Sequence, residues 1–189
     1  MKSGYAIVYS ILRMFFTPLF PMRYIGRENI PEGAAIVCAN HTSSVDPLLV
    51  AFALKMNQYP HFMAKIELYK VPLLGRILKA IGVFFVDRGK SDVGAIRASM
   101  QYLKAGEKIM MFPEGTRVSE DDAIAAKTGA VRLAVRLGVP ILPIYVPRKK
   151  RLFRGSNVII GKPYCIEPME KPDYQALSDE LLLRIKELS

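Results

Sequence analysis

Short apolar runs alternate with helical patterns along most of this 189-residue chain, and this alternation limits the folds open to it. An apolar run bounded by turn residues indicates a strand that is buried on both faces. Such runs occupy 34–39, 62–64, 83–86, 109–112, 141–146 and 158–160, and helical patterns occupy 47–56, 66–80, 92–104, 128–137 and 174–188. The pattern predicts a single α/β domain with a mostly parallel central sheet flanked by helices.

An apolar segment at residues 5–22 precedes the first predicted strand. Arg13 interrupts it and no small-residue cleavage site follows, so we do not expect a secretory signal. On a helix its polar residues form one narrow stripe, made of Ser3, Ser10, Arg13 and Thr17. This is typical of an amphipathic helix lying in a membrane interface, although a core helix packed on the domain gives the same pattern. We therefore divide the chain into a membrane-associating helical segment, 1–29, and a domain, 30–189.

Charge and hydropathy narrow the expected partners. The chain has 27 Lys and Arg against 17 Asp and Glu, a net charge of +10, and its hydrophobic fraction is 51%. A basic protein favours polyanions, but no zinc-finger, P-loop or RNA-recognition signature is present. Apolar bias together with positive charge favours an anionic lipid surface over nucleic acid. The basic run at 148–151 is either a solvated loop or part of such a lipid contact.

His41 and Asp46 form the first candidate site, in the sequence NHTSSVDP at 40–47 directly after a predicted strand. Imidazole is a natural general base for a hydroxyl near neutral pH, and a carboxylate on its other nitrogen fixes the tautomer. The structural alternatives are a core histidine and an aspartate that caps the helix beginning at Pro47. His61 has no acidic neighbour in the sequence, and we expect a structural or surface role for it.

Nucleophilic catalysis has weaker support. Ser43 and Ser44 lie too close to His41 along the chain for the usual triad geometry, and no G-x-S-x-G turn occurs. Cys38 and Cys165 lie in apolar runs and have no zinc-site spacing, so we expect buried, reduced thiols. We expect neither a metal site nor a cofactor.

The sequence FPEGTR at 112–117 forms the second candidate site, again after a predicted strand. Gly115 permits close backbone approach to a ligand, and the planar guanidinium of Arg117 suits phosphate. Glu114 either bonds a substrate hydroxyl or holds Arg117, and the plain alternative is a surface loop with an ion pair. Arg88 and Lys65 also follow predicted strands. Because ligands bind at the carboxyl ends of parallel strands, we expect these groups to share one crevice.

Four ordered blocks resemble the glycerolipid acyltransferase family, and especially its bacterial 1-acylglycerol-3-phosphate acyltransferases. The blocks are NHTSSVDP at 40–47, GVFFVDR at 82–88, FPEGTR at 112–117 and VPILPI at 139–144. The resemblance makes residues 30–189 the acyltransferase domain. It implies transfer of a fatty acyl group from an acyl thioester to the free hydroxyl of lysophosphatidate, giving phosphatidate. His41 would deprotonate the hydroxyl and Asp46 would orient His41, without an acyl-enzyme.

The resemblance also assigns an acceptor-binding group, consisting of Lys65, Arg88, Glu114, Gly115, Thr116 and Arg117. It places the protein at the cytoplasmic face of the cell membrane as a peripheral or monotopic enzyme. The family's two-helix membrane motif fits only in part, because the segment before residue 34 has room for one such helix. The sequence does not separate acyl-CoA from acyl carrier protein as the donor, nor does it give the chain length or the oligomeric state. Glycerol-3-phosphate or another lysolipid remains an alternative acceptor, and a non-catalytic lipid-binding module remains an alternative function.

Overall fold

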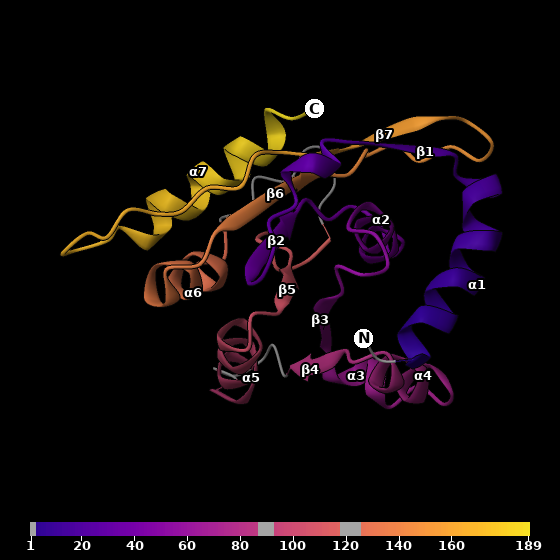
Figure 1. The fold of residues 1–189 in the computed structure, drawn as a ribbon, viewed down its shortest axis with the longest axis horizontal. Helices are drawn as coiled ribbons and strands as arrows, with labels where there is room; N and C mark the ends of the chain where they lie inside the picture. The colour runs from indigo at the N-terminus through magenta and orange to yellow at the C-terminus, as the bar shows by residue number, and fades with distance from the viewer. Residues whose placement is uncertain (1–2, 87–92, 118–125) are drawn as a thin grey trace.

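The computed structural model describes residues 3–86, 93–117 and 126–189, and within these ranges it contains one seven-stranded sheet (Figure 1). The strands are β1 (Met22–Ile25), β2 (Ala35–Ala39), β3 (Pro60–Lys65), β4 (Phe84–Val86), β5 (Lys108–Met111), β6 (Ile141–Tyr145) and β7 (Ser156–Ile160). The helices are α1 (Ser3–Leu19), α2 (Asp46–Ala53), α3 (Ile66–Tyr69), α4 (Leu74–Ala80), α5 (Val93–Lys104), α6 (Gly129–Leu137) and α7 (Tyr174–Lys186), with a short 3-10 helix at Arg27–Asn29.

The sheet is mostly parallel, as the sequence predicts. Its strand order is β1-β7-β6-β2-β5-β3-β4, and the pairs from β6 to β4 are all parallel. β7 runs antiparallel to β6 and pairs in parallel with β1. The segment 1–29 is therefore not helical throughout, because residues 22–25 join the sheet.

Helices cover both faces of the sheet, which explains why the central strands are apolar throughout. Val37 and Ala39 of β2 point into a core that includes Leu49 and Val50 of α2. Ile36 and Cys38 point to the other face, into a core built with α5, α6 and α7. Figure 1 shows α1 and α2 on one side of the sheet and α5, α6 and α7 on the other. The expected α/β layering is confirmed.

Helix α1 lies against the domain by one side only. Tyr5 and Tyr9 are buried, and the ring of Tyr9 meets that of Phe52 in α2 edge-on at 5.2 Å. A second apolar side is exposed, formed by Ile7, Ile11, Met14, Phe15 and Leu19. None of the helices in the described part of the chain is long and apolar enough to cross a membrane.

Candidate active site

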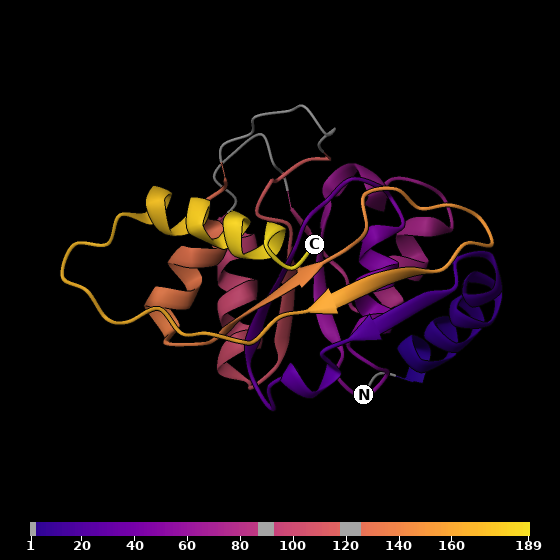
Figure 2. The same ribbon diagram turned by 90° about the horizontal axis from the view of Figure 1, so that it is seen from above.

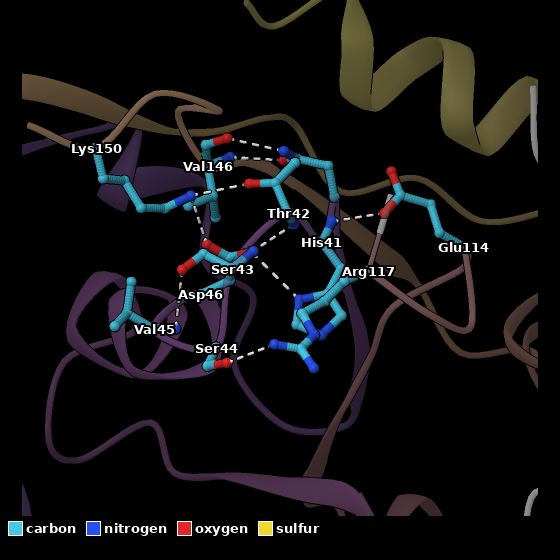
Figure 3. Close-up of polar contacts among 11 residues, drawn as sticks. His41, Thr42, Ser43, Ser44, Val45, Asp46, Glu114, Arg117, Val146 and Lys150 are labelled. Atoms are coloured by element: carbon cyan, nitrogen blue, oxygen red, sulfur yellow. Dashed lines mark hydrogen bonds and ion pairs between the residues drawn. The ribbon is translucent and has the colours of Figure 1, made fainter. Parts of the chain in front are cut away.

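His41 and Asp46 meet in the turn that joins β2 to α2. The chain leaves β2 after Ala39, turns through small residues and enters α2 with Pro47 in its first turn, as expected. This turn brings Nδ1 of His41 to 3.2 Å from Oδ2 of Asp46 (Figure 3). Two side chains separated by five positions thus form one hydrogen-bonded pair at the carboxyl edge of the sheet.

Asp46 is fully buried and has a dense set of partners. Oδ2 also accepts the backbone N–H groups of Thr42 and Ser43, both at 2.7 Å. Oδ1 forms an ion pair with Nζ of Lys150 at 2.7 Å. Burial alone would raise the pKa of the Asp46 carboxyl, but the bonds from His41, Lys150 and the Ser43 amide together hold that pKa below its ordinary value. Asp46 is therefore a fixed, ionised carboxylate.

The predicted helix-capping role of Asp46 is wrong in its geometry. Val45 occupies the N-cap position of α2, no side chain caps the helix there, and Asp46 is the first helical residue. The carboxylate bonds the amides of Thr42 and Ser43, which precede it, because the turn folds back over the carboxylate. Asp46 thus orders the loop that carries His41 rather than the helix that follows.

The His41 ring is fixed from two directions. It stacks on Phe112 with ring centroids 3.9 Å apart and planes 14° from parallel. Its side chain is 14% exposed, and its Nδ1 faces Oδ2 of Asp46 as a hydrogen-bond partner. When Nδ1 carries the proton that Asp46 accepts, the lone pair lies on Nε2. The arrangement can therefore present a neutral imidazole as a base through Nε2.

Glu114 supports the same loop from the turn after β5, the strand next to β2. Its carboxylate is buried, and Oε2 accepts the backbone N–H of His41 at 2.7 Å. Burial raises the pKa of this carboxyl to about 6, against the opposing effects of the His41 amide and of Arg148. The sequence predicted that Glu114 bonds a substrate hydroxyl or holds Arg117, and it did not predict this contact with the backbone of His41.

The turn after β5 extends toward the His41 loop. Gly115 has a φ of +70°, a backbone conformation that residues other than glycine rarely adopt, and its N–H donates to the Phe112 carbonyl. Arg117 is exposed and donates from Nη1 to Oγ of Ser44 at 2.8 Å, while Thr116 is exposed beside it. The structure thus brings together His41, Asp46, Glu114 and Arg117, which are distant in the sequence.

The remaining predicted residues are less closely placed. Lys65 ends β3 with its side chain exposed at the same edge of the sheet. Arg88 lies outside the described residues. Lys150 was not predicted as a site residue, although its loop follows β6, a neighbour of β2, and so leaves the sheet at the same edge. That adjacency comes from the sheet order, so no motif in the sequence marked Lys150.

The cysteines and the second histidine lie outside this cluster. Cys38 is a buried strand residue as expected, and burial raises the pKa of its thiol. Cys165 is exposed, which corrects the expectation of a buried thiol. His61 does have an acidic partner, Glu107, at 2.7 Å. Among residues 3–86, 93–117 and 126–189, no three His, Cys, Asp or Glu side chains gather to hold a metal ion.

The family model described as "Acyltransferase" matches residues 21–147, which include every block of the resemblance and exclude α1. This chain belongs to the acyltransferase family. Its predicted family is therefore confirmed, and the His41 loop, the 112–117 turn and β6 all fall inside the matched region.

Individual relatives agree with this assignment. The chain is 32% identical over 182 residues to a 1-acyl-sn-glycerol-3-phosphate acyltransferase of Bacillus subtilis, covering 88% of this chain and 87% of the relative. It is 35% identical over 144 residues to a probable enzyme of the same name from Mycoplasma pneumoniae, covering 70% and 54%. The crystal structure of the acyltransferase PlsC from Thermotoga maritima matches with a TM-score of 0.71 at 25% identity, over 97% of this chain and 76% of that one. The α/β fold of this acyltransferase is thus the PlsC-like one.

Proposed function

We propose that this acyltransferase moves a fatty acyl group from an acyl thioester to the free hydroxyl of 1-acyl-sn-glycerol 3-phosphate, giving phosphatidate. The observation that carries the proposal is the contact between His41 Nδ1 and the buried, ionised Asp46, with Arg117 held to the same loop. The names of the relatives support this choice of acceptor. The active site would then combine a general base with a phosphate-binding cation.

In this mechanism Nε2 of His41 removes the proton from the acceptor hydroxyl. The oxygen attacks the thioester carbonyl, the carbon–sulfur bond breaks, and the leaving thiolate takes the proton from the imidazolium. Asp46 keeps the proton on Nδ1 and stabilises the imidazolium. Positioned general-base catalysis, the role given to His41, typically contributes about 10²–10⁴ in rate. The stacking of His41 on Phe112 supports a fixed direction for Nε2.

Direct attack without an acyl-enzyme is part of the proposal. Cys38 is buried, and its raised thiol pKa opposes formation of a thiolate. Ser43 and Ser44 belong to the same turn as His41, and their contacts are with that turn and with Arg117. Mixing the enzyme with acyl donor alone should give no covalent adduct in intact-protein mass spectrometry, whereas a stoichiometric acyl adduct would contradict this step.

The acceptor would bind between the 112–117 turn and the loop after β2. Arg117 is assigned to the phosphate, with charge contributed by Lys65 at the end of β3 and by Arg88, which follows β4 in the sequence. Gly115 and Thr116 would shape the turn against the glycerol, and Glu114 would hold the His41 backbone in register. Acyl-CoA and acyl carrier protein are both candidate donors, and no cofactor enters the reaction.

A membrane surface is the proposed source of the acceptor. Figure 2 shows the end of α1 beside the loop between β6 and β7, and the Phe153 N–H donates to the Leu19 carbonyl at 2.8 Å. Leu152 and Phe153 are exposed at the tip of this loop, next to Arg151 and Arg154. Together with the exposed side of α1 they form an apolar surface with a basic margin, which suits an anionic bilayer.

A competition assay tests the proposal. Vesicle-bound enzyme is given lysophosphatidate, lysophosphatidylcholine, glycerol-3-phosphate and monoacylglycerol in equal amounts, with each donor in turn, and products are identified by mass spectrometry. We expect phosphatidate as the main product. Preferential acylation of glycerol-3-phosphate or lysophosphatidylcholine would change the acceptor, and preference for monoacylglycerol would contradict the phosphate role of Arg117. Vesicle binding without thiol release would indicate a non-catalytic module.

A further inference from the structure

Lys150 reaches the loop that carries His41 from the separate loop after β6. Two hydrogen bonds between the Asn40 amide and the backbone of Val146, at 2.8 and 2.7 Å, tie the end of β2 to the end of β6. The chain continues from Val146 into the loop that carries Lys150. Figure 3 shows the Lys150 side chain directed at Asp46 and Thr42.

The contacts of Lys150 are those of a buried ion pair. Its side chain is 6% exposed, and Nζ lies 2.7 Å from Oδ1 of Asp46 and 3.0 Å from Oγ1 of Thr42. A lysine is almost never buried unless its charge is paired, because its ammonium group is strongly hydrated. The neighbouring basic residues Lys149 and Arg151 are exposed. Lys150 alone among residues 149–151 turns inward, toward the carboxylate that bonds His41.

We propose that Lys150 is a positioning residue for the His41–Asp46 pair, fixing the Asp46 carboxylate through Oδ1 and moderating the proton affinity of His41. This inference rests on the proposed role of His41 as the base. The two oxygens of Asp46 have separate partners, since Oδ2 bonds His41 and the loop amides while Oδ1 meets Lys150. With Oδ1 anchored, the carboxylate cannot rotate away from His41 without breaking a buried ion pair.

Charge gives Lys150 its second effect. The charged groups around His41 are Asp46 on α2, Lys150 after β6, and Glu114 and Arg117 on the turn after β5, with Arg148 acting on Glu114. Asp46 alone favours the imidazolium, which is inactive as a base. The positive charge of Lys150 offsets part of that attraction.

Replacing Lys150 tests the proposal. In Lys150→Met, the ring titration of His41, followed by NMR of labelled histidine and assigned with His41→Ala, should move to higher pH by roughly one unit. The acidic limb of the kcat/KM profile should move with it, and kcat at neutral pH should fall about tenfold, less than on loss of the base itself. The KM for lysophosphatidate should not change. Lys150→Arg, which keeps the charge, should restore most of the wild-type profile.

Lys104→Met is the matched control, because Lys104 is exposed at the end of α5 before β5, at the opposite edge of the sheet. It should leave the titration and the kinetics as in the wild type.

Lys150→Gln removes the charge while keeping a hydrogen-bond donor, and it replaces Lys150→Met in the test if the methionine variant does not fold. Unchanged His41 titration and unchanged kcat in a folded variant would overturn the proposal, as would a raised acceptor KM alone. The titration needs no turnover, so it decides the question even if the proposed transfer activity is absent.

Discussion

Asp46 is the residue on which the local structure depends most, since its carboxylate joins the His41 ring, two loop amides and Lys150. Asp46→Asn removes the charge that stabilises the imidazolium, and we expect kcat to fall about a hundredfold or more. It also leaves Lys150 buried without its counterion, which should lower the free energy of unfolding by about 3 kcal/mol. Urea unfolding and steady-state kinetics measure the two effects separately.

A double variant distinguishes these two losses. Asp46→Asn with Lys150→Met removes both charges, so part of the lost stability should return while activity stays low. If activity returned together with stability, Asp46 would be a structural residue only.

Glu114 gives a pH prediction with a definite sign. Burial raises its carboxyl pKa to about 6 from an ordinary 4.5, so the folded protein binds this proton more tightly than the unfolded chain does. The stability that the folded protein gains from this protonated carboxyl is fully present below pH 4.5, and it is lost as the pH rises through 6. At pH 8, Glu114→Gln should therefore be more stable than the wild type by about 2 kcal/mol, and near pH 4 the difference should vanish. Urea titrations at both pH values test this, and a glutamine variant that is less stable at pH 8 would contradict it.

At the scale of elements, the turn that contains Gly115, directly after β5, is where backbone geometry matters most. Gly115 has φ +70°, and an added Cβ would lie 2.8 Å from Cγ of Lys127. Gly115→Ala should cost about 1 kcal/mol of stability and displace Arg117, raising the KM for lysophosphatidate. Gly33→Ala is the control, because Gly33 has φ +75° with nothing within 4 Å and precedes β2 at the far edge. It should lose similar stability and retain full activity, and equal kinetics in both variants would argue against a role for the turn.

Most elements could be predicted from the sequence because the central strands are apolar runs, and β2, β3 and β5 are each followed by a helical pattern. β1 escaped prediction because its residues alternate between half-buried and exposed, so no apolar run marks it. The antiparallel direction of β7 had a signal, since the chain between β6 and β7 is too short and irregular for the usual parallel crossover.

The site was predictable to the same extent. The motifs after β2, β3 and β5 lie at the predicted edge of the sheet, so His41, Asp46, Lys65 and the 112–117 turn are where the sequence placed them. Contacts from a loop with no motif, such as Lys150 on Asp46, depend on which strands are neighbours and need the fold.

At the scale of the whole molecule, one exposed apolar surface lies on α1 and the neighbouring loop tip, far from α7 in Figure 1. Phe15→Ser and Phe153→Ser, at residues 60% and 72% exposed, should each weaken binding to anionic vesicles about tenfold or more. Leu183→Ser on α7, at 54% exposure, should have no effect. Vesicle sedimentation measures this, and added salt should weaken binding of the wild type because its net charge is +10. Equal binding by all variants would place the membrane contact elsewhere.

General-base catalysis by His41 is the central claim, and the most direct measurement is acyl transfer by folded His41→Ala. Thiol release and phosphatidate formation are followed together, with circular dichroism and urea unfolding as the check on folding. His61→Ala serves as the control, since His61 pairs with Glu107 in the domain and should tolerate substitution without loss of the chemical step. We predict that His41→Ala loses at least about a hundredfold in kcat while binding lysophosphatidate normally. Wild-type turnover by this folded variant would contradict the mechanism.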